Sequence, residues 1–228
     1  FYTRQHKFYC GIDLHARKMY ICILDEKGEV REHRNIRTDG NIFLQMITPY
    51  RENIVVAAEC IFTWYWLADL CQKEGIPFVL GHALYMKAIH GGKTKNDKID
   101  SHKIAVLLRG GMIPMAYVYP EKMRATRDLL RRRNHLMRKR AELFAHIQNT
   151  NTQYNLSDSF GCIAKPPNRN GIVEQFKHPA VQKSMAVDLE VVRTYDTILT
   201  DLERTLIKLA NHHDPVSYAL LQSIHGVG

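Results

Sequence analysis

Three short runs of strand-forming residues, joined by tight turns, stand near the start of this 228-residue chain. The runs are FYCGIDL, KMYICILD and VREHRNIR, and the segment EKGE between the last two is a turn signal. Strands joined by such short connections pair in an antiparallel sheet. Residues 8–37 are therefore expected to form a meander of three antiparallel strands.

The following segment, residues 40–111, alternates between helix and strand patterns. NIVVAAE and IPFVLG are compact apolar runs, typical of strands buried on both faces. Helical segments precede, separate and follow them, and the last of these is KIDSHKIAVLLRGG. The expected order is βββαβαβα, which matches the ribonuclease H-like arrangement as an analogy at the level of fold. We expect an α/β domain with a mixed sheet and flanking helices.

After Pro120 the pattern changes to that of one long helix. No Gly or Pro occurs from Glu121 to about Tyr154. Apolar residues recur there every seven positions, which predicts a coiled-coil-like seam. The first such series is Leu129, Leu136 and Leu143, and the second is Leu130, Met137 and Phe144.

A loop and a second amphipathic helical stretch, from about 182 to 212, follow this helix. The two helices predict either an antiparallel hairpin or a coiled-coil arm that pairs with another subunit. The expected domains are therefore residues 1–118 for the α/β part, 119–212 for the helical arm and 213–228 for a final segment.

Four acidic residues fall where this fold would bring them together. Asp13 lies within the first strand between two aliphatic residues, and Glu59 ends the fourth strand. A ribonuclease H-like sheet places these two strands side by side. Asp97 and Asp100 are three positions apart, so they share one face of a helix. Adjacent buried carboxylates repel each other and are costly unless they are paired or bound to a cation.

Four hard oxygen ligands suit Mg²⁺ or Mn²⁺, and two such ions about 4 Å apart can clamp a phosphate. Each acid also has a plainer interpretation when it is considered alone. Asp97 is well placed to be a helix N-cap, Asp100 to be a first-turn charge, and Glu59 to end a strand in solvent. Considered together on this topology, the four predict a catalytic metal site.

Basic residues dominate the long helix, and the net charge of +9 with a pI near 9.3 favours an anionic partner such as nucleic acid. A solvated face is the alternative interpretation. His15 follows Asp13 by two positions, and either a phosphate contact or a structural role fits it. The residues predicted to contact nucleic acid are Lys93, Lys95, Arg127, Arg131, Arg132, Arg133, Arg138, Lys139 and Arg140.

The remaining composition bears on compartment. No apolar run is long enough to span a membrane, and no signal peptide is visible. The five cysteines are odd in number, and most lie in apolar runs, as reduced core thiols do. A cytoplasmic location is expected. The chain begins at Phe1 without a Met, so residues may precede it.

Three segments, YCGIDLHA, VVAAECIFTWYWLADL and GGKTKNDKIDSHKIA, resemble the DEDD-type insertion-sequence transposases of the IS110 group, which also includes the pilin-gene invertases. The resemblance implies a RuvC-like domain whose four acids correspond to Asp13, Glu59, Asp97 and Asp100. It also implies a smaller C-terminal domain that carries a serine nucleophile and begins near a Gly-x-Gly segment similar to GVG. Residues 213–228 would be the start of that domain, and no nucleophile is expected within this chain. His225 stands where a proline is common in the family.

This resemblance implies a DNA recombinase that is guided by a structured RNA. The long helical arm leads us to expect a homo-oligomer, a dimer or tetramer. The residues alone leave two alternatives open. One is a metal-dependent RuvC-like nuclease that cuts DNA junctions with water as nucleophile. The other is a non-catalytic nucleic-acid-binding scaffold whose acids only cap and pair. On the first reading, the 228 residues alone bind metal and nucleic acid but give no recombinant product and no protein–DNA adduct.

Overall fold

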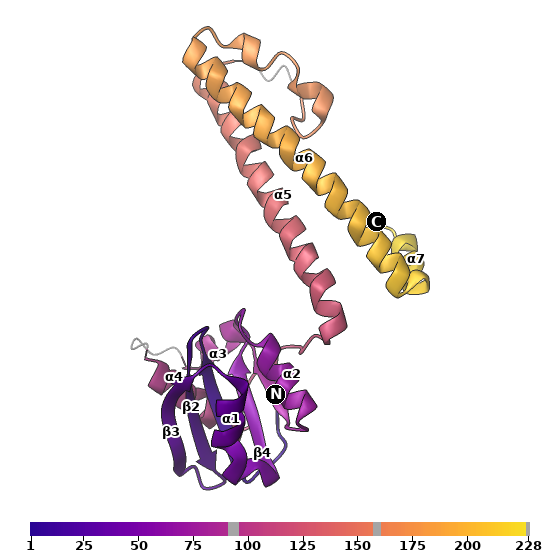
Figure 1. Cartoon of the computed structure of the whole chain (residues 1–228). Helices are drawn as coiled ribbons and strands as arrows, with labels where there is room; N and C mark the ends of the chain where they lie inside the picture. The colour runs from indigo at the N-terminus through magenta and orange to yellow at the C-terminus, as the bar shows by residue number, and fades with distance from the viewer. Residues whose placement is uncertain (91–95, 157–160, 227–228) are drawn as a thin grey trace. The chain divides into compact units, whose positions relative to one another are not determined.

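The computed structural model describes residues 1–90, 96–156 and 161–226 (Figure 1). The chain divides into two compact units. We refer to Phe1–Glu121 as the sheet unit and to Lys122–Gly228 as the helical unit.

The sheet unit is built on five strands in the order β3-β2-β1-β4-β5. The central strand β1 pairs antiparallel with β2 and parallel with β4, so the sheet is mixed. The predicted meander and the two later strands are confirmed, and the runs FYCGIDL, KMYICILD and VREHRNIR coincide with the first three strands. The bounds are β1 Phe8–Leu14, β2 Lys18–Asp25, β3 Val30–Arg37, β4 Ile54–Glu59 and β5 Phe78–Gly81.

Helices cover both faces of this sheet. Side chains of successive strand residues point to opposite sides, so each buried strand offers apolar side chains to the helices on both faces. Cys10, Ile12 and Leu14 pack on one face with the buried residues of α1 and α2. Tyr9 and Ala57 pack on the other, which we call the α4 face, with apolar residues of α3 and α4. This arrangement confirms the ribonuclease H-like α/β class. The helices are α1 Gly40–Ile47, α2 Tyr65–Lys73, α3 Ala83–His90 and α4 Asp97–Arg109, with a 3₁₀ helix at Thr48–Asn53.

The helical unit contains two long helices that run side by side in opposite directions (Figure 1). Arg133 pairs with Glu203, and Arg140, later in α5, pairs with Asp196, earlier in α6. Partner numbers therefore fall as residue numbers rise, which is the register of an antiparallel hairpin within one chain. The helices are α5 Glu121–Gln153, α6 Pro179–His213 and the short α7 Pro215–Ser223, and 3₁₀ helices lie at Pro166–Arg169 and Val173–Gln175.

The connection between α5 and α6 supplies much of the core of the helical unit. Ile163, Ile172 and Phe176 from this connection pack against Ile147 of α5 and Met185 of α6. A buried arginine ties the same connection to both helices. Arg169 donates to the backbone oxygens of Ile163 and Ala164 and pairs with Asp196, which also binds Arg140. Among the helices that the structure describes, none combines the length and apolar character needed to cross a membrane.

Candidate active site

Two strand ends bring the first pair of predicted acids to the same side of the sheet. In the parallel pair of β1 and β4, Ile12 lies opposite Ala58. The next residues along these two strands are Asp13 and Glu59. Their carboxylates therefore project from neighbouring strands on the α4 face. Asp13 is only 9% exposed, and Glu59 is half-buried.

A glycine brings the third acid to this place. A Cβ atom at Gly11 would lie 2.3 Å from the backbone oxygen of Ser101 and 2.3 Å from the backbone nitrogen of Ala105. The backbone of α4 therefore rests directly on β1 where β1 has no side chain. Asp97 precedes Ser101 by about one helical turn, so this close approach places Asp97 beside Asp13.

His15 joins the two carboxylates. Its Nε2 atom lies 3.2 Å from Oδ2 of Asp13 and 3.7 Å from Oδ1 of Asp97. One ligand atom from each of the three residues lies within 4.8 Å of the others, which makes them a group able to hold a metal ion. Asp100 lies one helical turn further along α4, where the Nζ atom of Lys103 is 3.5 Å from its Oδ1. The structure thus gathers Asp13, Asp97 and His15 closely.

The charge balance at this site favours a cation. Burial raises the pKa of the Asp13 carboxyl above its usual range, and the carboxylates of Asp97 and Asp100 raise it further, although the charge of His15 opposes them. Across the described ranges, no Lys or Arg forms an ion pair with Asp13 or Asp97. A buried carboxylate that is destabilised by its neighbours, and that has no Lys or Arg partner among the described residues, fits a divalent ion, for which carboxylate oxygens are preferred ligands.

The alternative interpretation of Asp97 as a helix cap is wrong. Asn96 is the N-cap of α4, and its side-chain oxygen accepts a hydrogen bond from the backbone N–H of Lys98. Asp97 is the first residue of the helix, so its carboxylate is not used for capping and is available to the site. The predicted first-turn position of Asp100 is confirmed.

Sequence reasoning missed the contacts that hold the start of α4 against the sheet. Nε2 of His33 on β3 lies 2.8 Å from the backbone oxygen of Lys98, to which it can donate a hydrogen bond. Ser101 is fully buried, and its hydroxyl donates to the same oxygen. The one sign of these contacts in the sequence was the alternation of strand residues, by which His33 lies on the α4 face of β3 together with Asn35.

The model of the IS110-type DEDD transposases, whose description is "Transposase", matches residues 10–156, a span that contains all four predicted acids. The chain belongs to this family. No curated protein matches it. This transposase is therefore an enzyme that acts on DNA. Membership also points to the use of divalent metal ions, in agreement with the donor set around Asp13.

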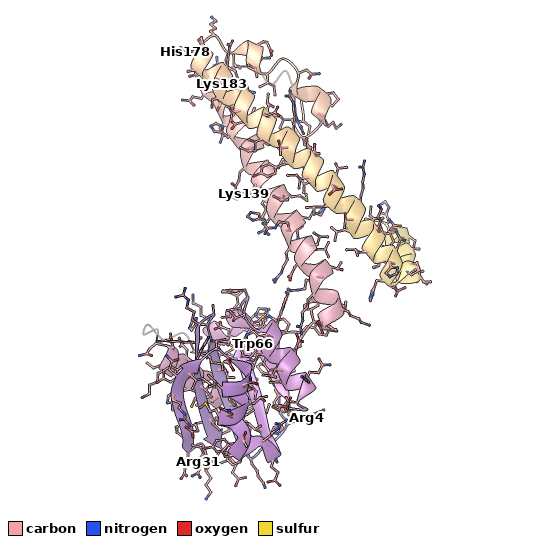
Figure 2. All side chains as sticks on the ribbon, in the orientation of Figure 1. Arg4, Arg31, Trp66, Lys139, His178 and Lys183 are labelled. Atoms are coloured by element: carbon pink, nitrogen blue, oxygen red, sulfur yellow. The ribbon has the colours of Figure 1, made fainter. Side chains whose placement is uncertain are left out.

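The basic residues predicted on α5 fall into two groups in the transposase. Arg133 and Arg140 pair with acids of α6, and Lys139, labelled in Figure 2, pairs with Glu142 on its own helix. Arg127 lies 3.8 Å from Asp128. In the part of the chain that the structure describes, no ion pair involves the exposed side chains of Arg131, Arg132 and Arg138. Lys93 and Lys95 lie outside the described residues.

We expect nucleic-acid binding by α5 to depend on the exposed group formed by Arg131, Arg132 and Arg138. Replacing Arg131, Arg132 and Arg138 together with Gln should lower the affinity for unrelated duplexes and reduce the slope of log affinity against log salt by about one for each lost phosphate contact. Fluorescence anisotropy over a range of NaCl concentrations measures both quantities.

The matched control changes three exposed basic residues of α6, Lys183, Arg204 and Lys208, to Gln. It removes the same charge from the same hairpin. Equal salt slopes for the two triple variants would mean that α5 acts only through net charge.

Proposed function

We propose that this transposase is the carboxylate-bearing part of an insertion-sequence recombinase, in which Asp13, Glu59, Asp97 and Asp100 act as one site for Mg²⁺ or Mn²⁺. One observation carries the proposal. A buried strand carboxylate, Asp13, meets a helix carboxylate, Asp97, across the glycine contact, and no lysine or arginine in the described ranges neutralises either of them. Such an arrangement is unfavourable unless a cation completes it.

Each acid has a distinct task in the proposed site. Asp13 is fixed by its strand and its burial, so it is the rigid ligand. Asp97 and Asp100 come from the first turn of one helix and move only together with it. Glu59 closes the site from the end of β4. A bound divalent ion would supply positive charge against the charge that develops on a phosphate.

The attacking group of the proposed reaction is a serine hydroxyl from outside these 228 residues, as the family resemblance implies. Its oxygen would form a bond to a DNA phosphorus while the bond to one DNA oxygen breaks, which conserves a phosphodiester for rejoining. Its proton would be lost, and the leaving DNA oxygen would take one up. Ser101, although beside Asp100, suits this role poorly because it is buried and its hydroxyl is already used.

The same proposal includes a structured guide RNA and a homo-oligomer. Arg131 and Arg138 are exposed, seven residues apart on α5, and duplex RNA is recognised mainly through its shape and phosphates. Exposed apolar side chains along α6 and α7, among them Ile198, Leu209 and Leu220, support association through the helical unit. Light scattering of the purified protein distinguishes a monomer from a dimer or tetramer.

The test of the metal site is Mn²⁺ binding, followed by electron paramagnetic resonance and by thermal unfolding of the sheet unit. At a concentration about 100 times the dissociation constant, an ion that binds only the folded state stabilises it by about 2.7 kcal/mol. We expect Asp97→Asn to weaken Mn²⁺ binding about tenfold or more, because it removes one charged ligand.

Asp201→Asn is the matched control, since Asp201 is an exposed acid of α6 in the helical unit. If the two variants bind Mn²⁺ equally, Asp97 only pairs with its neighbours, and the scaffold alternative is favoured. Denaturing electrophoresis of labelled DNA with a protein that includes the serine segment tests the chemistry. Cleavage without a covalent adduct would favour the junction-nuclease alternative over the recombinase.

A further inference from the structure

A basic cleft opens beside the carboxylates, and none of its residues was predicted to have a function. It has a volume of about 660 Å³ and lies where the β1–β2 turn meets the end of β3. Its polar lining is Arg17, Lys18, Asn35, Arg37 and Thr38. We call it the Arg17 cleft. It lies wholly within the sheet unit.

The strand register places three residues of this cleft, Lys18, Asn35 and Arg37, relative to the candidate active site. Asp13 is opposite Tyr20, and Tyr20 is opposite Asn35, so these residues form one row across the α4 face. Lys18 is opposite Arg37 and forms the next row on the same face. Two residues along an antiparallel strand span about 6.8 Å. The basic row is therefore one pleat beyond the row that contains Asp13.

Among the described residues, the cations of the cleft have no acidic partner. In the portion that the structure describes, no side-chain hydrogen bond or ion pair involves Arg17, Lys18 or Arg37. Other arginines of the same sheet do have partners, since Arg31 pairs with Asp25 and Arg34 with Glu32. Three neighbouring cations that repel one another are best satisfied by an anionic ligand.

Hydrogen bonds hold the two walls of the cleft together. The hydroxyl of Thr38 donates to the backbone oxygen of His15 at 2.8 Å, and the N–H of Thr38 donates to the backbone oxygen of Arg17 at 3.1 Å. The N–H of His15 donates to the backbone oxygen of Lys18 at 3.1 Å and closes the turn. The cleft is thus preformed, which lowers the cost of ordering it on binding.

We infer that the Arg17 cleft binds backbone phosphates of the DNA strand whose reacting phosphate lies on the carboxylates. The inference rests on the proposed metal site, and it extends that site by a neighbouring phosphate subsite. Guanidinium groups bind phosphate through paired hydrogen bonds. Lys18 and Arg37 lie one pleat from Asp13 along the strands and one or two strand spacings of about 4.8 Å across them, a span that a few nucleotides of one DNA strand can cover. A single strand running along the sheet end can therefore occupy both places.

The experiment uses the whole chain with both arginines replaced, Arg17→Gln and Arg37→Gln. The control is Arg4→Gln with Lys7→Gln, which removes the same charge at the opposite end of β1; Arg4 is labelled in Figure 2. The probe is a fluorescein-labelled 20-base-pair DNA duplex, followed by anisotropy over a range of NaCl concentrations. We expect the cleft variant to bind about tenfold more weakly near 0.1 M salt, with a salt slope smaller by about two. The control should change the affinity less than twofold.

Two further measurements separate the possible failures. Mn²⁺ titration without DNA should give the same affinity for the cleft variant and the wild type, because neither arginine is a proposed ligand. An RNA hairpin of equal length serves as the competing probe. The inference is overturned if the cleft variant and the control bind DNA alike, or if only RNA binding weakens. Wild-type protein that binds no Mn²⁺ would instead overturn the proposed metal site, whatever the DNA result.

Discussion

Replacing Asp13 by Asn is expected to abolish metal binding and, at the same time, to make the metal-free protein more stable. The Asp13 carboxyl is buried and lies near the negative charges of Asp97 and Asp100, so its ionised form is unfavourable in the folded chain. Asn keeps the shape and removes the charge. The gain in stability and the loss of the ligand then have one cause, as is common for functional sites.

The pH dependence of stability shows why Asp13→Asn should raise the stability of the metal-free protein. The pKa of Asp13 is raised in the folded protein above its unfolded value. The folded state therefore holds this proton more tightly, and stability falls as pH rises from the unfolded pKa through the folded one. Asn cannot titrate. The melting temperature of Asp13→Asn should exceed that of the metal-free wild type at pH 7, and the difference should shrink as pH falls toward about 4.

Activity should respond in the opposite direction. If a metal site supplies several kcal/mol of charge stabilisation to a phosphate, its loss lowers DNA strand cleavage by a protein that includes the serine segment by about a thousandfold or more. Calorimetric Mn²⁺ titration and thermal unfolding at two pH values measure the first two effects, and Asp201→Asn is again the control. An Asp13→Asn protein that binds Mn²⁺ normally, or that is less stable than the wild type without metal at pH 7, would contradict the prediction.

The sheet and its central acid could be predicted because their signals are local. Strands of the meander have short turns and alternating or fully apolar runs, and these patterns depend on neighbouring residues only. Asp13 is conspicuous because a charge within an apolar strand needs a reason. Glu59 and Asp97 could be assigned to the same site only by assuming a sheet topology. The order of the predicted strands and helices supplied that topology.

The basic cleft could not be predicted because its residues meet across strands. Arg17 and Lys18 lie in one hairpin turn, whereas Arg37 lies at the end of another strand. Their proximity follows from the pairing of Lys18 with Arg37, which no spacing in the sequence reveals. The same applies to Gly11, whose role depends on which helix packs over it. On α5 the sequence also hides ion pairs, because the acidic partners of Arg133 and Arg140 come from α6.

The helical unit was predicted in outline, and α5 Glu121–Gln153 agrees with the helix expected from Glu121 to about Tyr154, but the start of the second helix was not predicted. The second helix was expected from about residue 182, whereas α6 begins at Pro179, because the ring of His178 caps it and proline is favoured in the first turn. The short helix α7 was missed altogether. Asp214 ends α6 and caps α7, and Pro215 starts the new helix immediately, so the sequence offers no loop between them.

Gly11→Ala is expected to disrupt the site without changing any group that touches metal or DNA. The new methyl group would lie 2.3 Å from two backbone atoms of α4. Ordinary contacts between such atoms are about 3.5–4.0 Å, so α4 must move outward by roughly 1 Å. Asp97 and Asp100 move with the helix, whereas Asp13 stays in the sheet. The ligands therefore separate.

Three effects of different size follow from the added methyl group. Overpacking costs about 1–3 kcal/mol of stability, which lowers the melting temperature by several degrees. A displacement of about 1 Å can lower the rate of a positioned reaction about a hundredfold. We expect Mn²⁺ affinity to fall about tenfold or more, as for Asp97→Asn, although every proposed ligand is retained. Circular dichroism establishes that the variant is folded before Mn²⁺ is titrated.

Gly40→Ala is the matched control. The added methyl group there meets a flexible Leu70 side chain at 3.2 Å, at the start of α1, which packs on the face of the sheet away from α4. It should leave Mn²⁺ affinity unchanged. The position of α4 would have no part in metal binding if Gly11→Ala lowered the melting temperature but bound Mn²⁺ as tightly as the wild type. A fall in Mn²⁺ affinity confined to Gly11→Ala would instead mean that the absence of a side chain at residue 11 sets the distance between the strand carboxylate and the helix carboxylates.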